Sequence, residues 1–312
     1  MHDLGGKVAL VTGASKGIGK GIALEIGACG ATVYVTARTV EPTATTPGLR
    51  TTAAEIDELG GRGVPLQCDH ADDAQVEAVM RRIGDEHGAL DVLVNNASPD
   101  FSSMVGKPFW EISFDDLDRC LDIGPRSAYV TTALAVRQML PRRHGLVVNV
   151  SSHGAVDYIL SVPYCIGKAG IDKITRDAGR ELRPHGIAVV SLWPGLVLTE
   201  RVMSQATVDD DGTLRMHGLD LAMGESPRFS GRAIAALATD PAVMQRSGGS
   251  FPASTLARAY GFTDLDGHLP PEVRNLATFL GDSDDVPDFW KVVDPYPTTG
   301  APTTGAPTTE PA

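Results

Sequence analysis

Cysteine and positive charge are both scarce in this sequence. The four cysteines (Cys29, Cys68, Cys120 and Cys165) form neither a C-x-x-C pair nor the dense pattern of a disulfide scaffold. We therefore expect reduced thiols in a cytoplasmic protein. The net charge of −12 argues against a general nucleic-acid or anionic-membrane binder, because both of those partners attract basic surfaces.

Signals for metal binding and membrane insertion are also missing. The eight histidines are scattered, with no H-E-x-x-H and no Cys/His cluster, so we expect no metal site. No basic leader precedes an apolar run, and no apolar run is long enough to span a bilayer. We expect a soluble chain whose 312 residues, 42% of them hydrophobic, form one large or two small domains.

Short runs rich in β-branched residues alternate with segments of helical periodicity along most of the chain. The predicted strands are Lys7–Thr12, Ala31–Thr36, Val64–Cys68, Leu90–Val94, Leu146–Val150, Ala188–Leu192 and Ser250–Ala253. The predicted helices are Lys20–Gly30, Thr51–Leu59, Asp73–His87, Trp110–Leu121, Ala128–Leu140, Tyr164–Leu182 and Arg232–Leu237. This alternation predicts an α/β fold, a single Rossmann-type doubly wound parallel sheet with helices on both faces.

A glycine-rich turn joins the first predicted strand to the first predicted helix. It reads Gly13-Ala14-Ser15-Lys16-Gly17-Ile18-Gly19, with G-x-x-x-G-x-G spacing. Glycines at such a turn let the backbone approach a pyrophosphate, which the free N–H groups of the helix N-terminus then hold. A purely structural turn is the alternative. The position between strand and helix favours a dinucleotide site, with cofactor contacts from Gly13, Ser15, Lys16, Gly17, Ile18 and Gly19.

The end of the second predicted strand bears on the choice of cofactor. An acidic residue there accepts a hydrogen bond from the ribose 2′-hydroxyl of NAD(H), whereas this sequence has Ala37-Arg38-Thr39. Arg38 is able to pair with a 2′-phosphate and Lys16 adds a second cation, the alternative being two solvated surface charges. We therefore expect NADP(H), with NAD(H) the weaker choice.

Asp69, after the third strand, is placed to touch the adenine edge or, alternatively, to cap a helix.

Tyr164 and Lys168 are the candidate catalytic pair. At positions i and i+4 of a predicted helix they lie on one face, one turn apart. A phenol titrates near pH ~10 in water, and a neighbouring ammonium favours the phenolate and lowers that pKa. The pair Ser151-Ser152, at the end of the fifth strand, is placed to hold a carbonyl oxygen against the phenol. A surface Tyr/Lys pair on an ordinary helix is the alternative.

The predicted sheet favours the catalytic interpretation. Ligands of parallel sheets bind outside the carboxyl ends of the strands. The glycine turn, Asn96, Ser152 and Pro194-Gly195 all fall at such ends. We therefore predict one active site at that edge of the sheet, built around the tyrosine and the lysine.

Five motifs in this order resemble the short-chain dehydrogenase/reductase superfamily. They are Thr12–Gly19, Asn95-Asn96-Ala97, Ser152, Tyr164-x-x-x-Lys168 and Pro194-Gly195-x-Val197-x-Thr199, and the resemblance covers roughly residues 6–260. Three further segments resemble the branch of that family that includes dehydrogenase/reductase SDR family member 1. They are Val162-Pro163-Tyr164, Ser191–Gly195 and Leu256–Gly261.

The resemblance implies an NADP(H)-dependent oxidoreductase, a carbonyl reductase acting on a small-molecule carbonyl or on the matching alcohol, that forms a homodimer or homotetramer. It implies that Tyr164 exchanges the proton, that Lys168 lowers the pKa of the phenol and binds the ribose, and that Ser152 orients the oxygen. Further cofactor contacts are implied for Asn96, Ala97, Pro194, Gly195, Val197 and Thr199. A non-catalytic dinucleotide-binding sensor or scaffold of the same fold is the alternative function.

Two departures from the family pattern bear on the mechanism. Gly124 stands where family catalysts usually carry the asparagine of a water-linked proton relay. The usual spacing of thirteen residues before the tyrosine selects Ser151, whereas alignment on the strand end selects Ser152. We choose Ser152, because the strand fixes the direction of the side chain.

Composition divides the remainder of the chain. Residues 1–262 are predicted to form the dinucleotide-binding catalytic domain, in which 199–231 lacks clear periodicity and is expected to be a mobile substrate lid. Residues 263–294 are interpreted as a C-terminal extension. Residues 295–312, rich in Thr, Pro, Gly and Ala, are predicted to be a disordered tail.

Overall fold

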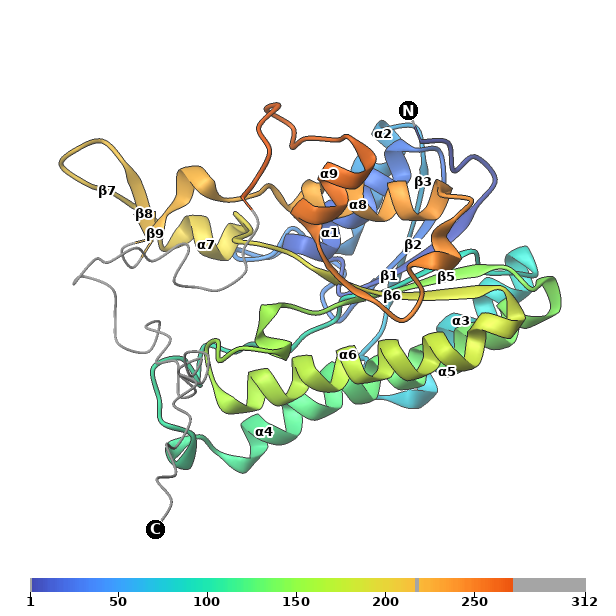
Figure 1. The fold of residues 1–312 in the computed structure, drawn as a ribbon, viewed down its shortest axis with the longest axis horizontal. Helices are drawn as coiled ribbons and strands as arrows, with labels where there is room; N and C mark the ends of the chain where they lie inside the picture. Colours follow the sequence, from blue (N-terminus) through green and yellow to red (C-terminus); the bar gives the residue numbers. More distant parts are fainter. Residues whose placement is uncertain (1, 217–218, 272–312) are drawn as a thin grey trace, which may run out of the picture.

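Seven parallel strands form the central sheet of the structure, a computed structural model that describes residues 2–216 and 219–271. Their order across the sheet is β10-β6-β5-β4-β1-β2-β3 (Figure 1). The strands are β1 (Val8–Thr12), β2 (Thr32–Ala37), β3 (Arg62–Gln67), β4 (Val92–Asn95), β5 (Gly145–Val150), β6 (Ile187–Trp193) and β10 (Ser250–Pro252). The predicted Rossmann-type, doubly wound parallel sheet is confirmed.

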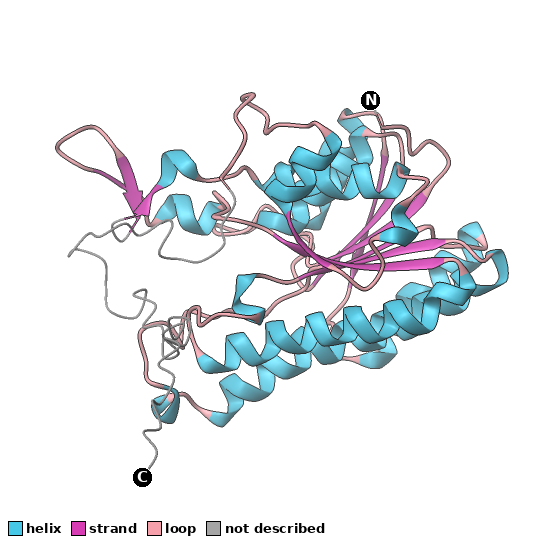
Figure 2. Ribbon diagram, in the orientation of Figure 1, coloured by secondary structure: helices cyan, strands magenta, loops and turns pink. Residues whose placement is uncertain are grey.

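Helices cover both faces of this sheet (Figure 2). One face carries α1 (Gly17–Ala28), α2 (Gly48–Glu58), α8 (Pro227–Thr239) and α9 (Ala253–Tyr260). The other carries α3 (Asp73–His87), α4 (Phe114–Leu121), α5 (Ser127–Met139) and α6 (Val162–Leu182). Side chains alternate along each strand, so that Val11 packs into the first layer and Leu10 into the second. Because both faces of the inner strands β1, β4, β5 and β6 are buried, these strands are mainly apolar along their length and do not alternate.

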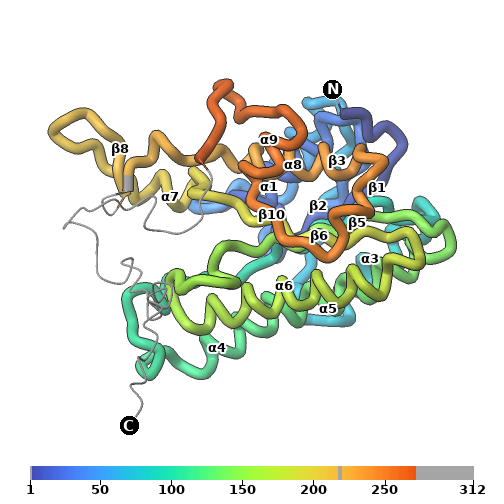
Figure 3. Tube along the Cα trace, viewed as in Figure 1, coloured from blue at the N-terminus to red at the C-terminus, as the bar shows by residue number. Residues whose placement is uncertain are grey.

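The strand order reverses beside β1, which pairs with β2 on one side and with β4 on the other. At such a switch point an open α/β sheet has a crevice outside the carboxyl ends of its strands. The chain segments that leave β1, β4, β5 and β6 therefore meet at one edge of the sheet. Both α6 and α7 (Glu200–Ser204) begin at this edge (Figure 3).

Helix boundaries differ from the sequence prediction on the first face. The helix expected at 232–237 begins at Pro227, whose fixed φ suits a first helical turn. The helix expected from residue 51 begins at Gly48, a residue with a positive φ of 83°. The helix α9 was not predicted. Eight residues are too few for a clear helical period after a strand of three residues.

The helix expected at 110–121 is broken into two pieces. A 3-10 turn at Phe109–Glu111 comes first, and α4 starts after it. The side chain of Ser113 accepts a hydrogen bond from the N–H of Asp116 at 3.1 Å and so forms a new N-cap. This cap, with Asp115 and Asp116 in the first turn that follows it, starts a new helix and ends the continuity that the apolar spacing indicated.

The segment 199–231 is more regular than the featureless lid that we expected. After α7 it contains a small antiparallel sheet of β7 (Thr207–Val208), β8 (Leu214–Met216) and β9 (Leu219–Asp220), followed by a 3-10 turn at Leu221–Met223. Met216 and Leu221 are buried in an apolar cluster separate from the main core. The unit projects from the body of the molecule (Figure 2). Its strands are only two or three residues long, which is too short for a period of two to be visible in the sequence.

The predicted tail at 295–312 and residues 272–294 of the predicted extension lie outside the described residues. The first part of that extension is docked, because the Asp264 carboxylate accepts hydrogen bonds from the N–H and the hydroxyl of Ser226, at 2.6 and 2.5 Å. Within residues 2–216 and 219–271, no helix combines the length and the apolar character needed to cross a membrane.

Close packing of α1 against α8 depends on Gly21. A Cβ atom placed on Gly21 would lie 2.2 Å from the carbonyl carbon of Pro227. That carbon is a backbone atom, so it cannot rotate away from the new methyl group as a side chain could. We expect Gly21→Ala to lower the free energy of unfolding by about 1–3 kcal/mol, the range for overpacked interiors. Gly84→Ala on α3 is the control, since its Cβ would meet only the flexible side chain of Gln138, at 3.3 Å. Urea denaturation of both variants checks this, and equal stability would contradict it.

Candidate active site

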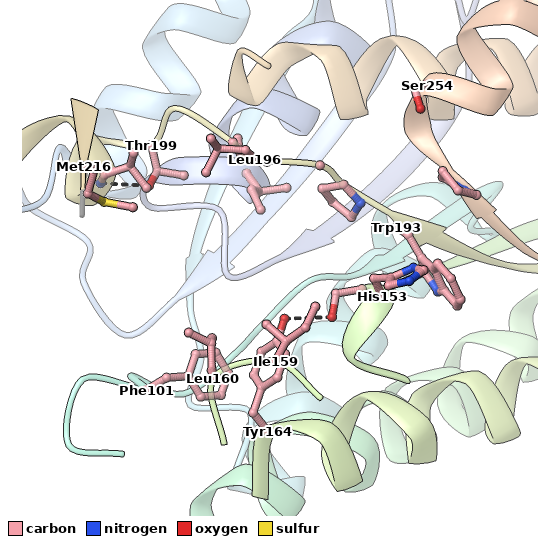
Figure 4. Close-up of a pocket in the computed structure, with 17 residues that line it drawn as sticks. Phe101, His153, Ile159, Leu160, Tyr164, Trp193, Leu196, Thr199, Met216 and Ser254 are labelled. Carbon is pink, nitrogen blue, oxygen red and sulfur yellow. Dashed lines mark hydrogen bonds between the residues drawn. The ribbon is translucent and has the colours of Figure 1, made fainter. Parts of the chain in front are cut away.

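Tyr164 and Ser152 meet at the carboxyl edge of the sheet. The phenol hydroxyl of Tyr164 donates a hydrogen bond to Ser152 Oγ at 2.8 Å (Figure 4). Ser152 follows β5 directly, and its Oγ also accepts from the N–H of Gly154 at 3.1 Å, which fixes the hydroxyl. Tyr164 lies in the first turn of α6, whose N-cap is Ser161. Two local caps therefore determine where the two hydroxyls lie.

Ser151 points away from this contact. It is buried, and its hydroxyl donates to the backbone carbonyl of Lys168 at 3.2 Å. Successive residues of a strand face opposite sides, so only one of the two serines is able to reach the phenol. The structure brings together Ser152 and Tyr164, as the choice made from the strand end predicts.

Lys168 lies one turn after Tyr164 on α6. Its Nζ donates to the carbonyl of Val150 at 3.1 Å and lies 5.6 Å from the centroid of the Tyr164 ring. Burial raises the pKa of the Tyr164 phenol to about 12, although the Ser152 hydrogen bond acts in the opposite direction. Burial also lowers the pKa of Lys168 to about 8. With protein groups alone, desolvation therefore outweighs the attraction that we expected to lower the phenol's pKa.

The glycine turn is locked to the end of β4. Asn96 Nδ2 donates to the carbonyls of Thr12 and Gly13, at 2.9 and 3.2 Å, and Thr12 Oγ1 accepts from the N–H groups of Asn96 and Ala97, both at 2.9 Å. Gly13 has a positive φ of 67°. A Cβ on Gly19 would lie 2.3 Å from Asn96 Nδ2. The turn thus needs glycine at both positions.

An acidic side chain occupies one hydrogen-bond donor of the glycine turn. Glu200 Oε2 accepts from the N–H of Gly17 at 2.9 Å, at the first residue of α1. Glu200 is the first residue of α7, whose N-cap is Thr199. A carboxylate at this place shows that the helix N-terminus accepts an anion, as a diphosphate would require. The turn and its glycines therefore fit the dinucleotide that the sequence predicts.

The residues proposed for the adenosine end lie around the same edge. Lys16 lies within the glycine turn and Arg38 directly follows β2, and both residues are exposed. Asp69 is half-buried after β3, and its carboxylate accepts from the N–H of Ala71 at 3.0 Å. Capping of α3 is done by Asp72, so the alternative role for Asp69 is wrong. Ser15 is buried, and its carbonyl accepts from the N–H of Gly48 at 3.2 Å.

The segment after β6 is held by a buried acid that the sequence did not reveal. Glu225 pairs with Leu196 and Leu198 through its backbone, at 2.8 and 2.9 Å. Burial raises the pKa of its carboxyl to about 8, and the N–H of Gly195 donates to this group. The carboxyl is therefore largely protonated at neutral pH. This contact fixes the loop from Pro194 to Thr199, in which Val197 is buried.

A cavity of about 380 Å³ opens beside Tyr164. Its walls are mainly apolar. Phe101, Ile159 and Leu160 lie beside Tyr164, and Leu196 and Met216 lie across the cavity from it (Figure 4). It is also lined by Ile18, Ser152, His153, Trp193, Pro194, Gly195, Val197, Thr199, Val202, Pro252 and Ser254. None of the described lining residues is lysine, arginine, aspartate or glutamate. The cavity therefore suits an uncharged, largely apolar ligand.

Several residues that line the cavity belong to none of the motifs identified in the sequence. Phe101 packs edge-on against the Tyr164 ring with centroids 4.8 Å apart, although it lies far away in the sequence. Leu160 has a φ of 61°, a conformation that a bulky side chain adopts only at a cost. Both come from loops, and nothing in the local sequence indicates that these side chains reach the cavity.

Gly124 forms part of an irregular turn between α4 and α5. The segment Asp122–Arg126 is a π-helical turn in which Gly124 has a non-helical ψ of −107°. No atom lies within 4 Å of the position that a Cβ on Gly124 would take. A second, very small cavity is lined by Gly124 together with Tyr164, Lys168 and Cys120. The glycine at this position thus leaves space beside Tyr164 and Lys168.

The chain has curated relatives along most of its length. Residues 7–210 match the family model described as short chain dehydrogenase. The chain is 42% identical over 269 residues to dehydrogenase/reductase SDR family member 1 of Mus musculus, covering 84% of each chain. It is 38% identical over 284 residues to the protein of the same name from Homo sapiens, covering 89% of each. A solved metagenomic short-chain oxidoreductase in complex with NADP is 27% identical, with a TM-score of 0.64, covering 80% of this chain and 96% of that one.

The Glu200 contact predicts that this carboxylate opposes cofactor binding. A diphosphate at the α1 N-terminus would lie beside the Glu200 charge or displace it. We expect Glu200→Gln to tighten NADPH binding by about fivefold, corresponding to about 1 kcal/mol for one charge at a helix N-terminus. Glu181→Gln, which removes an exposed charge near the far end of α6, should leave affinity unchanged. Fluorescence titration measures both, and weaker binding to Glu200→Gln would contradict this account.

Proposed function

Because this chain belongs to the short-chain dehydrogenase/reductase family, we propose that it transfers a hydride between NADP(H) and a carbonyl or secondary-alcohol substrate. The observation that carries this proposal is the 2.8 Å hydrogen bond from Tyr164 to Ser152, beside Lys168 and facing an apolar cavity. A proton donor, an oxygen-binding hydroxyl and a cation there meet the needs of carbonyl reduction.

Each residue of this group has a separate task. Bound NADPH would supply the hydride. The Ser152 hydroxyl binds the carbonyl oxygen, and the Tyr164 phenol donates its proton to that oxygen. The ammonium of Lys168 then stabilises the negative charge left on the phenolate. With a pKa of about 12, the phenol is protonated at neutral pH, which is the form that reduction requires.

The basic residues at the adenosine end support NADP(H) over NAD(H). Arg38 directly after β2 and Lys16 in the glycine turn are exposed, and β2 ends without a carboxylate, a combination that suits a 2′-phosphate. The metagenomic relative in complex with NADP has the same fold. The apolar cavity supports a carbonyl substrate with an uncharged body.

We also propose that the protein is a cytoplasmic homodimer or homotetramer. The helix layer containing α4, α5 and α6 exposes large apolar side chains, with Phe114 83%, Tyr129 62% and Ile166 47% exposed. Apolar surface gathered on one layer favours association between subunits. The four cysteines are free, as in proteins of a reducing compartment.

Removing the phenol hydroxyl tests the enzyme directly. Tyr164→Phe should lower the rate of NADPH oxidation by about 100-fold or more, the usual contribution of a proton donor. NADPH affinity should change by less than about twofold, since the cofactor keeps its other contacts. Absorbance of the reduced nicotinamide with a panel of apolar ketones and aldehydes gives the rate. Tight NADPH binding by the wild-type protein with no turnover of any carbonyl would instead favour the non-catalytic sensor, for which the Gly124 departure is the one supporting feature.

Cofactor choice is tested at Arg38. Arg38→Ala should weaken NADPH binding by about 1–3 kcal/mol, the loss expected for a charge-assisted phosphate contact. NADH lacks the 2′-phosphate, so its affinity should hardly change. Isothermal titration with both cofactors makes the comparison. Equal losses would show that Arg38 does not bind the 2′-phosphate.

A further inference from the structure

Asp172 links the catalytic helix to two strands through three neutral hydrogen-bond donors. Its carboxylate accepts from the hydroxyl of Ser191 on β6 at 2.7 Å and from the hydroxyl of Ser250 on β10 at 3.0 Å. It also accepts from the indole N–H of Trp193, with distances of 3.0 and 3.3 Å to its two oxygens. The donors approach both oxygens of the carboxylate, whereas a side-chain amide would offer only one accepting oxygen. All three donors are uncharged, so none of them neutralises the negative charge of Asp172.

The charge of Asp172 lies beside that of Lys168. The two residues are at i and i+4 of α6, on the same face of the helix. In the described part of the chain no cationic side chain forms an ion pair with Asp172, whereas Asp177, further along α6, pairs with Lys173 at 2.5 Å. The other titratable groups facing Lys168 are Tyr164 on α6 and Cys120 on α4.

Burial and Asp172 act on Lys168 in opposite directions. Burial lowers the pKa of the ammonium to about 8, and the carboxylate of Asp172 raises it. Without that carboxylate the pKa would be lower still, and Lys168 would lose its proton closer to neutral pH. The neutral amine would neither stabilise a phenolate nor attract an anionic cofactor.

Asp172 also fixes a wall of the cavity. Trp193, held by its indole N–H, contacts the ring of His153 edge-on, with centroids 5.5 Å apart and planes at 87°. Both rings line the cavity beside Ser152 (Figure 4). The Asp172 carboxylate thus contacts Trp193 in the cavity wall and also lies one helical turn from Lys168.

We propose that Asp172 is a positioning residue of the hydride-transfer site, which keeps Lys168 in its charged form and holds Trp193 against the substrate cavity. This inference rests on the proposed function. It concerns a residue outside the Ser152, Tyr164 and Lys168 group, and Asp172 is not among the residues that line the cavity.

The test measures NADPH affinity as a function of pH. In the wild-type protein, affinity should fall as pH rises through about 8, because Lys168 loses its charge there. In Asp172→Asn, which keeps the size and an accepting oxygen, this fall should begin about one pH unit lower. Lys168→Met should flatten the profile. Asp177→Asn removes a charge from the same helix further from the lysine and should leave the profile in place.

Three further variants separate the charge from the hydrogen bonds. Ser250→Ala removes one donor to the carboxylate and should not move the pH profile. Trp193→Phe keeps an aromatic wall without the N–H. It should raise KM for the carbonyl substrate with little change in kcat and with an unchanged pH profile. Asp172→Glu, which keeps the charge, should restore most of the wild-type profile.

The test of Asp172 gives a different result from a test of the proposed enzymatic function. NADPH binding is measured without turnover, so a catalytically silent protein still tests the effect of Asp172 on Lys168. An Asp172→Asn profile that coincides with the wild type, or one that Ser250→Ala reproduces, would overturn the proposal. Thermal unfolding of each variant at the same pH shows whether it is folded before its affinity is compared.

Discussion

Desolvation of Tyr164 and Lys168 is the constraint on which the rest of this site depends. Burial disfavours both charged forms, and it brings the phenol pKa to about 12 and the ammonium pKa to about 8. The site compensates with specific contacts, from Ser152 to the phenol and from the Val150 carbonyl to the ammonium. The same desolvation strengthens every electrostatic contact within the site, including any with a bound cationic nicotinamide. Burial of the pair is therefore both an energetic cost and the source of its chemistry.

The fold fixes this pair through polar contacts inside the sheet. Asn95 on β4 donates to Asn149 on β5 at 2.8 Å and to Thr132 on α5 at 2.9 Å, and Asn149 donates to Thr175 on α6 at 2.8 Å. These buried groups satisfy one another, and they tie the two strands to the helix that carries Tyr164 and Lys168. A shift of α6 along the sheet would leave several of them unpaired. The network therefore holds α6 in register with β5, the strand that Ser152 follows.

Local pattern predicted the parts of the molecule that local physics determines. The seven strands lie within two residues of their predicted ends, and the inner strands were predictable because burial on both faces gives them mainly apolar runs. The i, i+4 spacing placed Tyr164 and Lys168 on one face, and the strand end selected Ser152. The contact of Glu200 with Gly17 spans 183 residues and that of Asp172 with Ser250 spans 78, so no window of sequence reveals either. The small sheet in 199–231 was missed because its strands are too short to show a period.

The central claim is that a bound cofactor turns a buried, protonated phenol into a working acid and base. The most direct measurement is the ionisation of Tyr164 itself, followed by tyrosinate absorbance as the difference between the wild-type protein and Tyr164→Phe. The titration is carried out with and without NADP⁺. The account predicts a pKa near 12 for the protein alone and a fall of several pH units when the positive nicotinamide lies beside the phenol. A Tyr164 pKa that stays the same when NADP⁺ binds would contradict it.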